Sequence, residues 1–290
     1  MTPAPPPNAP WLNIAYVAAD VVREALARRS ILAILAVLGL GQVGLLVALD
    51  IDVVEGAVVS SRLLGELIDL CDVGSSAGEA MRPVYRFLGH AVFHLGMIFG
   101  VVSTSDLAVR ALSPGRVELL LSLPVRRADL VIGTWFGVMA VSLSGAVFAI
   151  GGFAAVLGLK VGSASLAPLF GAGAAAVGFG AVYAAMLLAT TLVRSAALAG
   201  GVGMALYVVA TATSARHEVL LAFERGWARD VAGVLLAPLP RLLGVAKAGA
   251  ALAAGEALDG EELAIALGTT VCFAVACVLL AVHVVQRRDW

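Results

Sequence analysis

Long apolar stretches alternate along the chain with short segments that carry charged and turn-forming residues. Six stretches have the length and character of a helix that crosses a bilayer, which takes about 20 mostly apolar residues. They cover residues 31–49, 87–105, 129–159, 168–193, 196–214 and 263–285. The third is long enough to tilt, or to break at Gly151–Gly152. The pattern predicts an all-α integral membrane protein with six transmembrane helices.

The segment before the first apolar stretch predicts a different kind of helix. Apolar residues recur at helical spacing over residues 11–29, and Asp20 and Arg23 interrupt them. This pattern is typical of an amphipathic helix that lies in the membrane interface, with Trp11 and Tyr16 as aromatic anchors. An ordinary soluble helix is the alternative, but a predicted span begins directly afterwards.

Two longer connections also contain apolar positions. Residues 50–86 mix acidic and apolar residues, and we expect short helices outside the membrane there. Residues 234–255 are apolar, but Pro238 and Pro240 interrupt them. Proline disrupts a helix, so an amphipathic or re-entrant hairpin at the outer surface is a better prediction than a seventh span.

The distribution of basic residues predicts the orientation in the membrane. An even number of spans places both termini on the same side. Arginines are concentrated before the first span, after the last, and in the connections that follow the second and fourth spans, whereas the short connection after the third has only Lys160. Because short cytoplasmic loops are enriched in basic residues, both termini of this multi-pass protein are predicted to be cytoplasmic.

Composition supports membrane residence and excludes some other classes. Only 13% of the 290 residues are charged, whereas soluble domains carry about 25%. The net charge is −1, with no basic block, which argues against nucleic-acid binding. Residues 1–10 are rich in proline and predict a disordered lead, and residues 11–290 form a single transmembrane domain.

One charged segment lies between the second and third spans, at residues 106–128, and is predicted to face the cytoplasm. Ser113-Pro114-Gly115 is a typical helix start, and the next eight residues, RVELLLSL, have room for about two turns. Pro124 ends this helix, because the residue before a proline is displaced from the α conformation. Physically, the segment is a short inward-facing helix held between two spans. A plain loop whose arginines follow the topology rule remains the alternative.

The run GRVELLLSLPVRRADLVIGTWFG at residues 115–137 resembles the signature of ABC-2 type transporter permeases, in the branch of nitrous-oxide-reductase maturation and gliding-motility systems. The positions that carry the resemblance combine glycines, an acid, leucines, a proline and an arginine. They are Gly115, Glu118, Leu120, Leu121, Pro124, Val125, Arg127, Gly133 and Gly137. The detailed likeness covers about 25 residues, and the arrangement of spans is similar over nearly the whole chain.

The resemblance implies that this segment is a coupling helix, which docks in a groove of a separate cytoplasmic ATPase subunit. The residues to which it assigns that contact are Arg116, Glu118, Leu120, Pro124, Arg126 and Arg127. The chain contains no Walker A sequence, so ATP and Mg²⁺ are expected on the partner, and no cofactor on this chain. No nucleophile and base stand together in the pattern, so we expect no enzymatic activity. A homodimer with one ATPase per copy is the expected assembly.

A second candidate site lies on the second span. His90, His94 and Met97 share one helical face, and imidazole and thioether groups are ligands that Cu(I) accepts. The alternative is two neutral histidines that hydrogen bond to neighbouring helices. Other polar residues of the spans either line a path or bond to backbone carbonyls. They include Gln42, Ser144, Thr190, Thr191, Thr269 and Thr270.

These observations predict an ATP-driven exporter subunit that couples to its ATPase through residues 106–128. A membrane subunit that transmits the ATPase stroke without moving a solute is an alternative from another class. A secondary transporter is a third reading, but it predicts charged residues at mid-depth, and the six predicted spans contain none.

Overall fold

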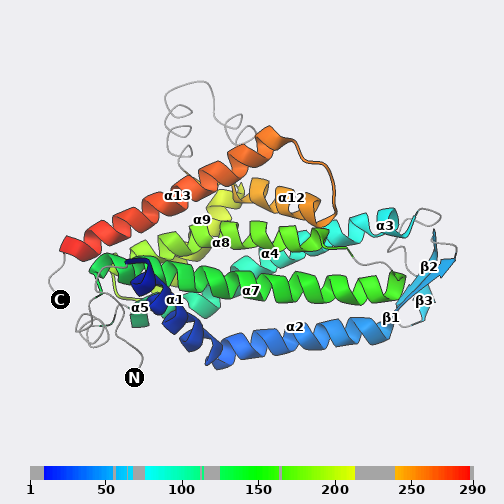
Figure 1. Cartoon of the computed structure of the whole chain (residues 1–290), viewed down its shortest axis with the longest axis horizontal. Coiled ribbons are helices and arrows are strands. Elements are labelled where there is room, and N and C mark those ends of the chain that lie inside the picture. Colours follow the sequence, from blue (N-terminus) through cyan, green and yellow to red (C-terminus); the bar gives the residue numbers. More distant parts are fainter. Residues whose placement is uncertain are drawn as a thin grey trace.

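The computed structural model describes residues 10–54, 57–63, 65–67, 76–111, 113, 125–162, 165–212 and 239–287. Within these ranges the fold is a bundle of long helices with a small sheet at one end (Figure 1). The helices are α1 (Pro10–Leu26), α2 (Arg29–Ala48), α3 (Ala77–Ala80), α4 (Arg82–Thr104), α5 (Leu107–Ala111), α7 (Arg127–Val161), α8 (Ala167–Leu192), α9 (Ala196–Ala212), α12 (Leu242–Ala253) and α13 (Gly260–Arg287). The strands are β1 (Leu49–Val54), β2 (Ala57–Leu63) and β3 (Glu66–Leu67).

Five described helical segments are long and apolar enough to cross a membrane. They are Arg29–Ala48, Gly78–Ala111, Arg127–Val161, Ala167–Leu192 and Gly260–Arg287. The remaining predicted span corresponds to α9, which has 17 residues and is shorter than these. The structure therefore confirms a helical membrane protein with five candidate spans, and the sixth crossing stays a prediction.

The helices α9 and α12 follow one another along the same side of α8. Met186, in the C-terminal half of α8, lies against Gly203 of α9. Gly171, near the start of α8, faces α12, and a β-carbon built there would lie 2.8 Å from the carbonyl oxygen of Gly249. Close approach of this kind needs small residues at the contact, as in many membrane helix pairs. The apolar stretch predicted as an outer hairpin thus contributes a buried helix, α12, to the bundle.

The connection after α2 forms a sheet instead of the predicted helices. The strands β1, β2 and β3 form an antiparallel sheet in that order. In its register, the backbone of Asp50 on β1 lies opposite that of Arg62 on β2. The sequence of β1, LDIDVV, begins with apolar and acidic residues in strict alternation, which is the period of a strand. Leu49 and Ile51 are buried in a cluster with residues of α7, while Asp52 is exposed. Among the described residues of this connection, the helical prediction was wrong for the three strands and right for α3 and the start of α4.

The helix α1 packs across the N-terminal part of α7 (Figure 1). Val17, Val21 and Ala25 form its buried face, whereas Trp11 and Tyr16 are exposed. Two glycines on α7, Gly133 and Gly137, make room for this contact. A helix is present over most of the predicted range, at Pro10–Leu26, and its role as an amphipathic helix in the membrane interface stays a prediction.

The helix α7 runs through Gly151–Gly152 without the break that the sequence allowed. The Gln42 side chain of α2 lies where a β-carbon at position 152 would be, and its Nε2 donates a hydrogen bond to the carbonyl oxygen of Phe148 at 3.0 Å. The helix ends at Gly162, whose φ of 73° is a left-handed conformation that glycine adopts easily. Gly152 thus admits a polar side chain from α2.

The bundle has two distinct ends (Figure 1). The start of α1 and the end of α13 lie at one end, which we call the termini end, together with α5 and the start of α7. The strands, α3 and the start of α4 lie at the opposite end, which we call the sheet end.

Candidate functional site

The predicted coupling segment falls partly outside the described residues. Those outside are Arg116, Glu118, Leu120 and Pro124. Of the residues assigned to the ATPase contact, the described ones are Arg126 and Arg127, at the start of α7. Both therefore lie at the termini end of the bundle, where the segment joins the span.

The start of α7 is fixed by an acid that contacts two other parts of the chain. Asp129 is buried, and its Oδ2 accepts a hydrogen bond from the backbone N–H of Arg126 at 3.1 Å. The same oxygen lies 3.5 Å from the side-chain Nδ2 of Asn13 on α1. A carboxylate is favourable in the first turn of a helix, where backbone N–H groups lack partners. The Arg126 side chain is exposed and takes no part in this cap.

The end of α4, where the coupling segment begins, is held by a network of four charged side chains. Asp106 forms ion pairs with Arg28, at the junction of α1 and α2, and with Arg110 at 3.2 Å. Arg28 also pairs with Glu24 at 3.1 Å, and only 14% of its side chain is exposed. Partial burial makes such a network less sensitive to screening than surface pairs. Sequence spacing could indicate the two i,i+4 pairs, but not the Arg28–Asp106 contact, which spans 78 residues.

The two ends of the coupling segment are therefore attached to the same helix, α1. Its Asn13 contacts the start of α7 through Asp129, and its Glu24 joins the network that holds Asp106. Within the coupling segment, α5 is buried along one side through Leu107, Ala108 and Ala111. The described residues on both sides of residues 114–124 are thus held by contacts to the bundle.

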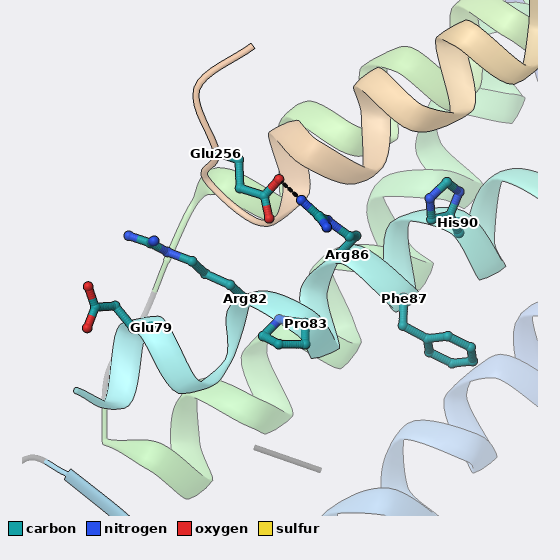
Figure 2. A pocket seen from close by; sticks show the side chains of 7 residues that line it. All are labelled: Glu79, Arg82, Pro83, Arg86, Phe87, His90 and Glu256. Atoms are coloured by element: carbon teal, nitrogen blue, oxygen red, sulfur yellow. Dashed lines mark hydrogen bonds and ion pairs between the residues drawn. The ribbon is translucent and has the colours of Figure 1, made fainter. Parts of the chain in front are cut away.

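A polar pocket of about 410 Å³ lies at the sheet end (Figure 2). Four charged side chains, a histidine and two apolar residues line it: Glu79, Arg82, Pro83, Arg86, Phe87, His90 and Glu256. All but Glu256, which follows α12, come from α3 and the first turns of α4. Arg86 forms an ion pair with Glu256 that ties α4 to the end of α12. No sequence pattern indicates this pocket, because Glu256 is 170 residues away from Arg86.

The three candidate metal ligands, His90, His94 and Met97, each contact a different part of the structure. His90 lines the polar pocket, and its ring stacks on that of His94 at a centroid distance of 6.2 Å. The Nδ1 of His94 hydrogen bonds to the hydroxyl of Tyr207 on α9 at 2.7 Å. Met97 is buried and packs against Gly178 of α8. Within the described ranges, no group of three or more His, Cys, Asp or Glu side chains could hold a metal ion. The Cu(I) hypothesis stays a prediction, and His94 has the interhelical hydrogen bond of the alternative reading.

Tyr207→Phe is expected to lower the free energy of unfolding by about 1 kcal/mol, because the hydroxyl that bonds to His94 is lost. Thermal unfolding of the purified chain in detergent measures the change. Tyr16→Phe is the matched control, since Tyr16 is 62% exposed and should show no shift. In a His94→Leu background, which has no hydrogen-bonding group at this position, the Tyr207→Phe effect should disappear, and an unchanged effect would show that the two side chains do not interact.

Most of the other polar side chains singled out in the spans bond to the backbone. Ser144 and Thr190 donate to the carbonyl oxygens of Ala140 and Met186, each one helical turn earlier, and Thr191, Thr269 and Thr270 do the same. Bonds of this type satisfy a hydroxyl within an apolar helix. These residues therefore follow the backbone-bonded reading, and Gln42 follows the interhelical one.

The fold and its apolar helices define a helical, membrane-embedded protein. The chain matches no protein-family model and no curated protein. Its more specific role must therefore be argued from the residues themselves, above all from those that hold the coupling segment.

Proposed function

We propose that the chain is the membrane-spanning permease subunit of an ABC-2 type transporter, driven by ATP hydrolysis on a separate ATPase subunit. In this proposal α9 is a sixth crossing, α1 lies in the inner interface, and the termini end faces the cytoplasm of a bacterial cell. Two copies pair in the inner membrane, and each binds one ATPase at residues 106–128. The chain itself binds no nucleotide.

The observation that carries the proposal is the attachment of both ends of the coupling segment. An element that transmits force must be held at each end by contacts that stay intact while the element is displaced. Asp129 at one end and Asp106 at the other are both engaged by other helices, and α1 takes part in both contacts. A loop that merely connected two spans would not require such contacts. This geometry favours the docking helix over the plain loop, and the signature at residues 115–137 supplies the class of partner.

The same contacts define what the residues would do in a transport cycle. Closure of the ATPase dimer would displace the short helix at residues 114–123. The displacement would reach α4 through Asp106 and α7 through Asp129. It would also reach α1, which is seated on Gly133 and Gly137, so that three helices move as one body. The ATPase supplies the energy, and this chain supplies a rigid path to the spans.

Two other classes make different predictions. A secondary transporter is expected to have charged groups at mid-depth. In the described spanning helices the Asp, Glu, Lys and Arg residues lie near the helix ends, and His94 on α4 is hydrogen bonded to Tyr207. A subunit that transmits force without transport would share every contact described above. ATP-dependent movement of a solute or lipid in proteoliposomes separates that subunit from an exporter.

The test of the proposal is co-purification with a Walker-containing ATPase, sought first in the neighbouring reading frame. We expect the tagged chain to retain the ATPase in detergent and to change its rate of ATP hydrolysis after reconstitution. If the two proteins do not associate, and hydrolysis is the same with and without the chain, the proposed class is wrong.

A further inference from the structure

The polar pocket at the sheet end contains an arginine that is not held in an ion pair with any described residue. Its two carboxylates equal its two guanidinium groups in number, so any excess of positive charge comes from a cation outside the lining. Glu256 pairs with Arg86, and Glu79 accepts a hydrogen bond from the Ser76 hydroxyl at 3.0 Å. Among the described residues, Arg82 has no ion-pair partner. Figure 2 shows its side chain extended away from the Arg86–Glu256 pair, to the side on which Glu79 lies.

Other features of the pocket also favour an anion. Lys247 on α12 is exposed and within electrostatic range of His90, which adds a third cation near the pocket. Arg82 lies four residues after the start of the helical run Gly78–Ala111, so the positive end of that helix dipole is nearby. A guanidinium group at such a position can hold a phosphate or carboxylate through two parallel hydrogen bonds.

The apolar part of the pocket distinguishes a lipid from a small soluble anion. Phe87 lines the pocket, is 74% exposed, and points away from the ion pair (Figure 2). Further exposed apolar side chains continue from it along α4, namely Leu95, Ile98, Phe99 and Val102. A soluble anion would gain nothing from this surface. An acyl chain would cover it, while the head group stays at the end of the span, where head groups lie.

We propose that this pocket binds the anionic head group of a membrane phospholipid. Arg82 holds the phosphate, Arg86 contributes while it remains paired with Glu256, and an acyl chain lies on Phe87 and the exposed apolar side chains that follow it. Binding of a lipid at this site does not require an ATPase, so the proposal can be tested independently of the proposed transport function.

Native mass spectrometry of the full chain, released from mixed phosphatidylglycerol and phosphatidylcholine vesicles, tests the proposal. We expect preferential retention of phosphatidylglycerol over phosphatidylcholine with the same acyl chains. Arg82→Gln should weaken that retention by roughly tenfold, because a charge-assisted contact is lost. Glu256→Gln should strengthen it several-fold, because it frees Arg86, and a misfolded variant would not produce that gain.

The controls separate this site from general attraction of anions. Arg62 is an exposed arginine on β2 at the same end and does not line the pocket, so Arg62→Gln should leave retention unchanged. Equal loss in Arg62→Gln and Arg82→Gln would overturn the proposal. So would full competition by free glycerol phosphate, which would indicate a soluble anion. A lipid-free dimer that Phe87→Ser dissociates would assign the apolar surface to a second copy instead.

Discussion

Arg126→Asp is expected to abolish stable binding of the ATPase while the chain remains folded. Arg126 is exposed at the start of α7, and its side chain takes no part in the cap, which uses its backbone N–H and Asp129. Aspartate is a favoured residue at this capping position, so the substitution reverses a charge without weakening the helix start. Reversal of a charge within a polar interface should weaken binding at least about tenfold. The measurement is retention of the ATPase by the tagged chain, together with its stimulated hydrolysis.

The structure offers a closely matched control at another helix. Arg241 is the capping residue of α12, is also exposed, and lies outside the coupling segment. Arg241→Asp makes the same chemical change in the same local position, and should leave both readouts at the wild-type level. If Arg126→Asp retains the ATPase as well as Arg241→Asp does, residue 126 does not belong to the interface. If both lose it, the effect is one of net charge.

Gly137→Ala is expected to destabilise the chain by about 1–3 kcal/mol, although alanine normally strengthens a helix. A β-carbon built at position 137 would lie 2.8 Å from the carbonyl oxygen of Ala18 and 2.8 Å from the Cβ of Val21. The carbonyl belongs to the backbone of α1, so relief requires the whole helix to move outward. Thermal unfolding in detergent, followed by loss of the monodisperse chromatographic peak, measures the change.

Gly145→Ala on the same helix provides the opposite expectation. A β-carbon at Gly145 meets nothing within 4 Å, so the gain in helix propensity should keep stability unchanged or raise it by up to about 1 kcal/mol. Gly133→Ala, whose β-carbon would lie 2.6 Å from the Cβ of Val17, should behave like Gly137→Ala. Equal midpoints for Gly137→Ala and Gly145→Ala would show that α1 is not seated on α7 in the purified protein.

The long apolar elements could be predicted from the sequence because each satisfies its backbone hydrogen bonds within itself. The helices α2, α4, α7, α8 and α13 begin and end within a few residues of the predicted spans, apart from α4, which starts five residues earlier. Length and apolarity are local properties, so no knowledge of neighbours is needed to find such a helix. The helix α1 could also be predicted, since its apolar residues recur at helical spacing.

The sheet shows where a local reading went wrong although the information was local. The alternation in Leu49-Asp50-Ile51-Asp52 favours a strand, but it covers few residues within a connection that also contains helical patterns. Tertiary contacts stabilise the strand conformation of this segment. Leu49 and Ile51 are buried with Ala154 and Leu157 of α7, and the Asp50 carboxylate forms an ion pair with Lys160 of α7 at 3.0 Å. Helical spacing would not have placed both apolar residues on one face.

The sequence by itself determined a helical membrane protein, its long apolar helices, and the position of a charged segment between two of them. Only the tertiary structure decided what holds that segment, because Arg28 and Asp106, or Asn13 and Asp129, are far apart along the chain. It also decided that Gly133 and Gly137 receive α1, and that Arg86 and Glu256 meet in one pocket. The physical reason is common to all of these. Hydrophobicity and helical period act between near neighbours, whereas ion pairs and close helix contacts depend on which distant segments the fold brings together.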